Sequence, residues 1–231
     1  SPSENIKNKK IITQLLKNIA ESTVEDLKLH IANAYHEDAE LKCFHPINNI
    51  KGVEEIYSKI WLPLKNSFND LERRNCLVLG GSFQDKVFVS SISLLTGTYN
   101  NPWLNIPSNN KTIHIRLCEA HEIKKGKIIH SHILIDVMDF IRQAGFWPIN
   151  KSNGAEGLWT NSISGDGSIF ENFDKNLSVS SLEQALTMQR SLNIKPECDP
   201  NADHSYVRDK LINHPQKEFW HKKMMWYGPS G

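Results

Sequence analysis

The spacing of apolar residues predicts helices in the first third of the chain. In three segments apolar side chains recur every three or four residues, which is the period of one face of an α-helix. The first two segments are marked by Ile12, Leu15, Leu16 and Ile19, and by Val24, Leu27, Ile31, Ala34 and Tyr35. The third is marked by Val53, Ile56, Tyr57, Ile60, Trp61 and Leu64. We expect Ser22 and Glu25 to form a capping box before the second helix, and Pro63 to kink or shorten the third.

The pattern changes to a β type in the second third. A short strand is predicted at 41–44, and longer stretches rich in Val, Ile, Leu and Thr follow at 71–79, 86–99, 112–123 and 127–137. A short helix from Met138 to Ala144 should end at Gly145 in a left-handed cap. Helices followed by strands are typical of the α+β class. We therefore expect helices packed on a curved antiparallel sheet.

Composition excludes some classes of function. The 231 residues include 27 Lys and Arg and 26 Asp and Glu, for a net charge of +1, and no basic patch carries interleaved aromatic residues, so a nucleic acid partner is not expected. No apolar run reaches the roughly 20 residues that a membrane-spanning helix needs, so a membrane partner is not expected either. The four cysteines include no CxxC pair, which speaks against a zinc ribbon or a disulfide framework. Reduced thiols and a cytoplasmic location are the expectation.

A series of short motifs resembles the SnoaL-like polyketide cyclases of the nuclear-transport-factor-two-like superfamily. They are similar to that family's segment before the last hairpin, its hairpin turn, its last-strand carboxylate and its closing helix. The motifs are, in order, Thr96-Gly97-Thr98-Tyr99, Ile106-Pro107 with Lys111, Gly126-Lys127-Ile128, Asp136 and Gln143-Ala144-Gly145. The resemblance implies an α+β cone that binds a small hydrophobic carbonyl-containing molecule. It also implies aldol-type ring closure without a metal or other cofactor.

The chain divides into four predicted parts: an N-terminal helical extension at 1–21, the cone domain at 22–148, a linker at 149–180, and the incomplete start of a second cone at 181–231. The linker is rich in Gly, Ser and Asn, although a surface loop pinned by Trp159 and Phe170 explains it equally well. The second copy rests on residues 219–229, which imperfectly repeat residues 35–46. Its aromatic and Met side chains predict docking on the first domain or pairing in a homodimer.

The last hairpin places the candidate catalytic residue. A two-residue turn at Lys125-Gly126 would put Ile115 opposite Asp136. An apolar surround would raise the pKa of Asp136 and suit it to act as a general base, the role that the resemblance also implies. Capping of the closing helix is the alternative role for this carboxylate.

The same register predicts a metal site as a less favoured alternative. It gathers Glu119, His121, His130 and His132 on one face of the hairpin, where they could bind zinc or iron. Hydrogen-bonded histidines at a solvated hairpin tip are the favoured explanation of these residues.

Five aromatic residues are candidate substrate contacts: Tyr35, Tyr57, Trp61, Tyr99 and Trp103. Core packing is the commoner role of such residues. The predicted pocket lies between the third helix and the concave sheet, bordered by Trp61 and Asp136. Three classes of function remain open: a cofactor-free cyclase or isomerase, a non-catalytic ligand-binding or dimerisation module, and a metal-dependent enzyme.

Overall fold

The structure is a computed structural model that describes residues 2–147, 166–168, 170, 174–192 and 215–222. The described residues form two compact units, one ending at Phe170 and the other starting at Asp174. The first unit contains, in order, α1 (Pro2–Glu21), α2 (Val24–Ala34), β1 (Tyr35–Cys43), β2 (Asn49–Lys51), α3 (Gly52–Glu55), the π-helical turn η1 (Ile56–Trp61), α4 (Leu62–Ser67), β3 (Glu72–Phe83), β4 (Lys86–Thr98), β5 (Thr112–Lys124), β6 (Lys127–Ile135), α5 (Val137–Ala144) and the 3-10 turn η2 (Asp166–Ser168). The second unit contains α6 (Lys175–Ser191) and the 3-10 turn η3 (Pro215–Phe219).

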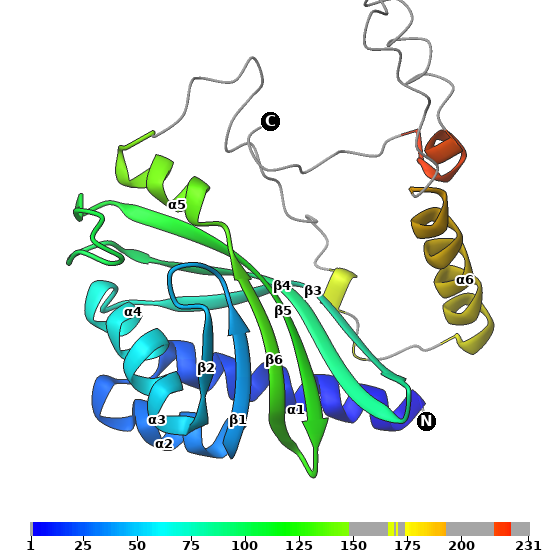
Figure 1. The fold of residues 1–231 in the computed structure, drawn as a ribbon, viewed down its shortest axis with the longest axis horizontal. Helices are drawn as coiled ribbons and strands as arrows, with labels where there is room; N and C mark the ends of the chain where they lie inside the picture. The colour runs from blue at the N-terminus through cyan, green and yellow to red at the C-terminus, as the bar shows by residue number, and fades with distance from the viewer. Residues whose placement is uncertain (1, 148–165, 169, 171–173, 193–214, 223–231) are drawn as a thin grey trace, which may run out of the picture. The chain divides into compact units, whose positions relative to one another are not determined.

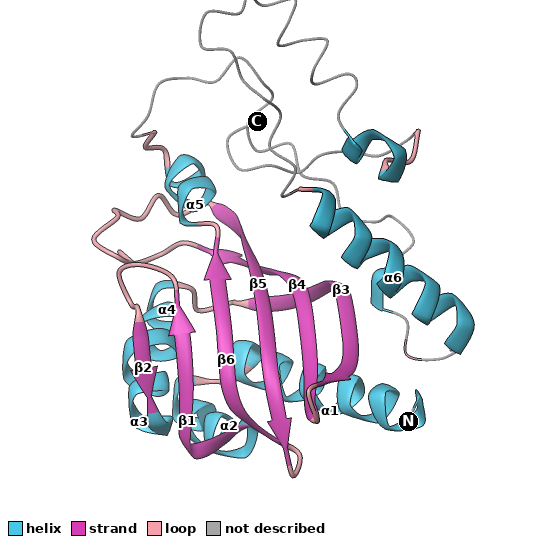
Figure 2. Ribbon diagram, turned by 45° about the vertical axis from the view of Figure 1, so that its right-hand side comes forward, coloured by secondary structure: helices cyan, strands magenta, loops and turns pink. Residues whose placement is uncertain are grey.

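A curved sheet of six strands organises the first unit, in the order β2-β1-β6-β5-β4-β3 (Figures 1 and 2). The predicted α+β class, with helices packed on a curved sheet, is confirmed. The expectation of a wholly antiparallel sheet is wrong at one joint, because β1 pairs with β6 in parallel. No hairpin connects these two strands, so the chain connection does not force them to run in opposite directions.

Helices α1 to α4 cover one face of the sheet and enclose the hydrophobic core (Figure 2). Helix α1, predicted as an extension of the domain, packs on β3 and β4 and contributes fully buried side chains to this core. These are Ile12, Leu16, Ile19 and Ala20. The other face of the sheet is partly exposed, with Leu79 at 58% and Leu134 at 64% exposure.

The third predicted helix continues past Pro63 to Ser67 by changing its hydrogen-bond pattern. The Leu62 N–H donates to the Tyr57 carbonyl, five residues earlier, instead of to the carbonyl four residues earlier. A proline in a regular helix lacks an N–H and its ring clashes with the carbonyl of the preceding turn. The π-turn accommodates Pro63 by widening the helix just before it.

Only part of the C-terminal third is described. Helix α6 begins at Lys175, so it crosses the predicted boundary between the linker and the second copy. Trp159 and most of the repeated segment 219–229 lie outside the described residues, and the predicted domain boundaries stay predictions. Across the described ranges, no helix is long and apolar enough to cross a membrane.

Candidate functional site

A β-bulge in the last hairpin decides which side chains enter the interior. Lys125 and Gly126 form the predicted two-residue turn, with φ values of 51° and 77°, and Lys124 pairs with Lys127. One residue later the register shifts, because Ile129 on β6 has no partner on β5. Side chains alternate between faces along a strand, so this inserted residue turns the rest of β6 to the face opposite the predicted one.

The bulge separates the four predicted metal ligands. Glu119 and His121 point into the interior and are buried, whereas His130 and His132 pair with Glu122 and Ala120 and point to the opposite face. The predicted block of four ligands on one face is therefore wrong. Among the residues that the structure describes, no group of three or more His, Cys, Asp or Glu side chains could hold a metal ion.

The interior instead contains a buried polar group that we term the inner cluster: Tyr35, Arg73, Ser91, Ser93, Glu119, His121 and Ser131. Its centre is an ion pair in which Arg73 Nη2 donates to Glu119 Oε2, with both side chains fully buried. The same guanidinium nitrogen donates to Ser93 Oγ at 3.0 Å. On the other side, His121 Nδ1 lies 2.7 Å from Ser131 Oγ, and His121 Nε2 lies 3.8 Å from Glu119 Oε1.

Four atoms of the inner cluster are buried without a hydrogen bond of normal geometry in the described part of the chain: the Tyr35 hydroxyl, Arg73 Nη1, Glu119 Oε1 and His121 Nε2. Ser131 is close enough to the Tyr35 hydroxyl to counteract part of the rise in its pKa, so this hydroxyl is the least isolated of the four. An unpaired buried polar atom costs about 1–3 kcal/mol, so such atoms are uncommon in folded proteins. Here they occur together. One is a carboxylate oxygen that can only accept, and the guanidinium nitrogen can only donate. The inner cluster thus has capacity for further hydrogen bonds of both kinds.

Burial and charge set the protonation of the inner cluster. Burial lowers the pKa of His121 to about 4, against the opposing effect of the Glu119 carboxylate. Burial alone would raise the pKa of Glu119, but the Arg73 and His121 charges and the hydrogen bonds from Arg73 and Ser91 hold that pKa below its usual value. Burial raises the pKa of Tyr35 far above its usual value. At neutral pH the cluster therefore holds an ionised Glu119, a neutral His121 and a protonated Tyr35.

Asp136 occupies a different position from the one that the sequence predicted. Leu117 pairs with Ile135, so Asp136 follows the end of β6 and does not lie opposite Ile115. Its Oδ1 accepts a hydrogen bond from the Asp139 N–H at 3.0 Å, and its Oδ2 accepts one from Arg116 at 2.5 Å. The predicted apolar surround is wrong, and the alternative role as the N-cap of α5 is confirmed. A role as catalytic base stays a prediction.

The five predicted aromatic contacts lie in or beside the core. Tyr35, Trp61, Tyr99 and Trp103 are buried and Tyr57 is half-buried. Tyr35 is the first residue of β1 and not part of a helix. Tyr99 stacks on Phe68 with ring centroids 5.0 Å apart, and Trp103 meets Phe140 edge to face at 5.1 Å. These rings fill the interior, and their contact with a ligand stays a prediction.

Sequence reasoning missed most of the inner cluster. Within the predicted strand 86–99, Ser91 and Ser93 share a parity with the buried residues Val89 and Leu95. That parity was a signal that polar side chains enter the core, but it could not identify their partners. The ion pair between Arg73 and Glu119 depends on the pairing of three strands, β3, β4 and β5.

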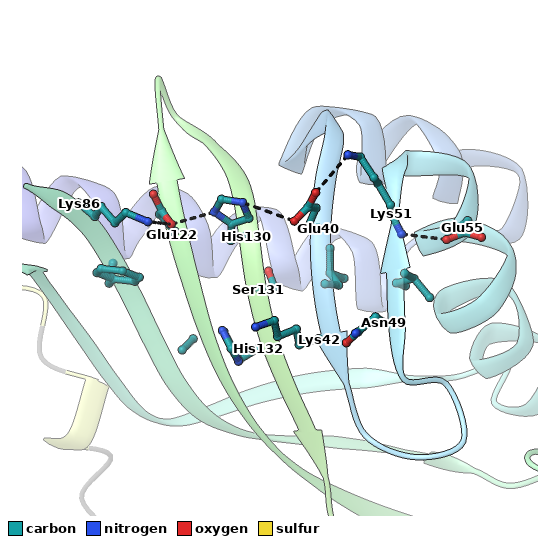
Figure 3. Close-up of a pocket in the computed structure, with 14 residues that line it drawn as sticks. Glu40, Lys42, Asn49, Lys51, Glu55, Lys86, Glu122, His130, Ser131 and His132 are labelled. Carbon is teal, nitrogen blue, oxygen red and sulfur yellow. Dashed lines mark hydrogen bonds and ion pairs between the residues drawn. The ribbon is translucent and has the colours of Figure 1, made fainter. Parts of the chain in front are cut away.

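A hollow of about 580 Å³ lies on the face of the sheet that the helices do not cover (Figure 3). We term it the outer hollow. Its lining includes side chains from β1, β2, β5 and β6, among them His130 and His132. Neither Trp61 nor Asp136 lines it, so it is not the pocket predicted between the third helix and the sheet.

Comparison with solved structures finds proteins of the expected architecture. AclR of Streptomyces galilaeus, a proposed hydroxylase, has a TM-score of 0.50 and 12% identity, and the match covers 83% of this chain and 99% of AclR. A proposed SnoaL-like polyketide cyclase from Jannaschia sp. CCS1 has a TM-score of 0.49 and 16% identity over 61% of this chain and 93% of its own. IdmH of Streptomyces antibioticus, a proposed polyketide cyclase, has a TM-score of 0.49 and 14% identity over 60% of this chain and 98% of its own.

At these identities the comparisons show the fold alone. The α+β architecture that the sequence motifs implied, helices packed on a curved sheet, is confirmed by the structure, and AclR shares this fold at a TM-score of 0.50. No family model and no curated protein matches the sequence. Any activity of this chain must therefore be argued from its own residues.

Proposed function

We propose that this chain binds a small apolar carbonyl compound inside the cone and catalyses a proton transfer of the isomerase or cyclase kind. The observation that carries the proposal is the unpaired Glu119 Oε1, buried in one cluster with two unpaired donors, Arg73 Nη1 and the Tyr35 hydroxyl. Proton transfer next to a carbonyl needs an acceptor for the proton and donors for the oxygen that becomes negative. The inner cluster supplies both kinds of group.

In the proposed reaction, Glu119 Oε1 takes a proton from the carbon next to the substrate carbonyl. The electron pair of the broken C–H bond moves into a C=C bond, and the carbonyl π pair moves onto oxygen to give an enolate. Arg73 Nη1 and the Tyr35 hydroxyl donate hydrogen bonds to that oxygen. Return of the proton to a different carbon completes an isomerisation. Attack of the enolate carbon on a second carbonyl, followed by proton return to the new alkoxide, completes a ring closure.

Glu119 is a better candidate for the base than Asp136, the residue that the sequence suggested. Both oxygens of Asp136 already accept hydrogen bonds, one from the α5 backbone and one from Arg116. Glu119 has one oxygen engaged by Arg73 and Ser91, and one without a hydrogen-bond partner, which lies 3.8 Å from His121 Nε2. Arg73 holds the pKa of Glu119 below its usual value, so this carboxylate is ionised and ready to accept a proton but is a weaker base than a carboxylate with a raised pKa.

A ligand must displace side chains to reach the inner cluster, because the unpaired atoms are shielded from solvent. We take Trp61 and Trp103 as the candidates for such a movement. Both indole rings are buried, and neither indole N–H has a hydrogen-bond partner within the described ranges. Their displacement would break no hydrogen bond of the indole, although it would cost ring contacts such as that of Trp103 with Phe140. Trp61 belongs to the π-turn, a feature often found at functional sites.

A non-catalytic ligand-binding or dimerisation module is the second candidate. One observation favours it: aromatic side chains fill the interior, and the inner cluster is shielded. In that case the Arg73–Glu119 pair holds strands β3 and β5 together and performs no chemistry.

Hydrogen exchange at carbon would test the proposal directly. The protein is incubated in D2O with a panel of small cyclic and conjugated ketones, and deuterium uptake next to the carbonyl is followed by NMR. We expect uptake at least 100-fold faster than in buffer for some members of the panel. We expect Glu119→Gln to abolish this acceleration and Asp136→Asn to retain most of it. Loss with Asp136→Asn alone would restore the role first expected for that residue.

The folded state of each variant is checked by circular dichroism, because Glu119→Gln leaves the buried Arg73 charge without its partner. Tyr35→Phe is the second active-site variant. It removes a hydroxyl that makes no hydrogen bond of normal geometry in the described part of the chain, so it should fold normally and slow exchange about 10-fold or more. Exchange no faster than in buffer for every ketone tested would favour the binding module.

A further inference from the structure

The outer hollow has two rows of polar side chains on the uncovered face of the sheet (Figure 3). The first row is a chain of paired charges. Lys86 Nζ lies 3.1 Å from Glu122 Oε2, which also lies 2.8 Å from His130 Nδ1. Lys51 Nζ lies 3.1 Å from Glu40 Oε1. Every lysine in this row has a carboxylate partner, so the row carries no spare positive charge.

The carboxylates of the first row are held in their ionised form. Hydrogen bonding to Lys51 and the charge of Lys51 lower the pKa of Glu40. Partial burial alone would raise the pKa of Glu122, but hydrogen bonds from His130 and Lys86 hold it below its usual value. These carboxylates compensate the Lys51 and Lys86 charges. A ligand anion would therefore compete with Glu40 and Glu122 if it approached this row.

The second row consists of Asn49, Lys42 and His132, which are neighbours across three strands. Lys42 pairs with Asn49 on β2 and with His132 on β6. All three side chains are exposed and line the hollow. None makes a side-chain hydrogen bond or ion pair with another described residue, and Figure 3 draws no interaction between them. Lys42 is thus the one lysine of the hollow that makes no ion pair in the described part of the chain, although its charge also helps to lower the pKa of Glu40, two residues earlier on β1.

Two apolar side chains line the hollow beside this row. Ala120 on β5 pairs with His132, and Phe88 on β4 pairs with Glu122 of the first row, diagonally across from Ala120. A volume of about 580 Å³ is within the usual range of small-molecule sites, which is about 300–1,000 Å³.

We propose that the outer hollow binds a small aromatic carboxylate. The carboxylate lies against Lys42, His132 and Asn49, and the flat apolar body lies over Ala120 against Phe88. The ammonium group of Lys42 supplies the charge, and the side chains of His132 and Asn49 supply further hydrogen bonds. This site is on the opposite face of the sheet from the inner cluster, and it does not depend on the reaction proposed there.

Titration with naphthalene-2-carboxylate, followed by ¹H–¹⁵N NMR, tests the site on the whole chain. We expect saturable shifts of the backbone amides of Lys42, Ala120 and His132. The neutral amide of the same shape, naphthalene-2-carboxamide, should bind at least 10-fold more weakly because it lacks the charge. Equal affinity for the acid and the amide, or no saturation with the acid, would overturn the proposal.

Matched charge variants test whether the acid binds specifically beside Lys42 or is attracted to any exposed lysine of the protein. Lys42→Gln removes the unpaired lysine and should weaken binding of the acid at least 10-fold. Lys17→Gln removes the same charge from an exposed pair with Glu21 on α1, and neither residue of that pair lines the hollow, so it should leave binding unchanged. His132→Gln should weaken binding severalfold. The proposal is wrong if Lys42→Gln binds like the unaltered chain, or if Lys17→Gln weakens binding as much as Lys42→Gln does.

Discussion

At the scale of single residues, the buried ion pair between Arg73 and Glu119 should be the contact whose disruption destabilises the fold most. Two charges removed from water are stable only while they compensate each other. We expect Arg73→Leu to lower the free energy of unfolding by about 3–5 kcal/mol, because it leaves the Glu119 carboxylate buried without its cation. Urea denaturation at pH 7 measures the change.

The double variant Arg73→Leu/Glu119→Leu is the control for that substitution. It removes both charges, so it should recover much of the stability that the single variant loses. A loss of less than about 1 kcal/mol in Arg73→Leu would mean that the guanidinium is not as buried as the structure indicates.

His121 should make stability depend on pH in a definite window. The unfolded chain binds a proton at this imidazole near pH 6.5, whereas the folded chain does so only near pH 4. Between these values the unfolded state binds more protons, so stability falls as the pH drops. For this residue alone we expect a loss of about 2 kcal/mol between pH 7 and pH 5. Chemical denaturation at the two pH values measures it.

A histidine variant isolates that contribution. His121→Gln should reduce the difference in stability between pH 7 and pH 5 by about 2 kcal/mol, whatever its effect on stability at pH 7. An unaltered difference in His121→Gln would show that this imidazole is able to take up a proton in the folded state.

Residue-scale prediction from the sequence succeeded where the cause was local. The left-handed cap at Gly145, with φ of 102°, follows from the end of a helical pattern. The second helix is capped by Thr23 and not by Ser22, a shift of one residue between two good capping side chains. The surroundings of Asp136 were predicted wrongly because they depend on strand register, and one bulge changes that register for all later residues of β6.

At the scale of elements, the long strands and their antiparallel pairing were readable from composition and turns. The bulge at Ile129 was not. Ile129 is an ordinary strand residue, and no glycine marks the insertion. The parallel joint of β1 and β6 was equally hidden, because the residues that pair are far apart in sequence and no turn links them. Both features depend on tertiary packing, which local patterns do not encode.

Deletion of Ile129 tests whether the bulge itself is needed for the fold. Without the extra residue, Ile128 still pairs with Ile123 and His130 with Glu122, so a regular ladder keeps His130 on the outer face and Ser131 inside. We expect the deletion variant to keep the fold and to unfold cooperatively. Its loss of stability should be similar to that of Ile129→Ala, which removes only a half-buried side chain and should cost about 1–3 kcal/mol. Loss of cooperative thermal unfolding in the deletion variant alone would show that the local twist of the bulge is required.

At the scale of the whole molecule, the hydrophobic core extends from Ile12 to Ala144 and lies within the first unit. Helix α1 is one wall of that core, so its apolar face stabilises the cone directly. The segment around η2 adds contacts on β3. Ser168 Oγ donates to the Asn75 carbonyl at 3.2 Å, and the Phe170 ring lies 5.3 Å from Lys9 Nζ. A chain that ends at Trp147 keeps the complete hydrophobic core of the described residues and loses the contacts of Ser168 and Phe170.

Pairing of the chain, either between two copies or between its own units, is the remaining prediction at this scale. Leu79, Phe83 and Leu134 are exposed on the uncovered sheet face, and burying each would contribute about 1.5–3 kcal/mol. We expect the whole chain to sediment as a self-associated species, and Leu79→Glu/Leu134→Glu to sediment as a monomer with the fold retained. Leu29→Glu is the matched control, because Leu29 is as exposed but lies on α2.

Sedimentation and thermal unfolding of the chain ending at Trp147 test the C-terminal unit. If that chain and the whole chain are both compact monomers of equal thermal stability, neither the sheet face nor the C-terminal unit contributes to pairing.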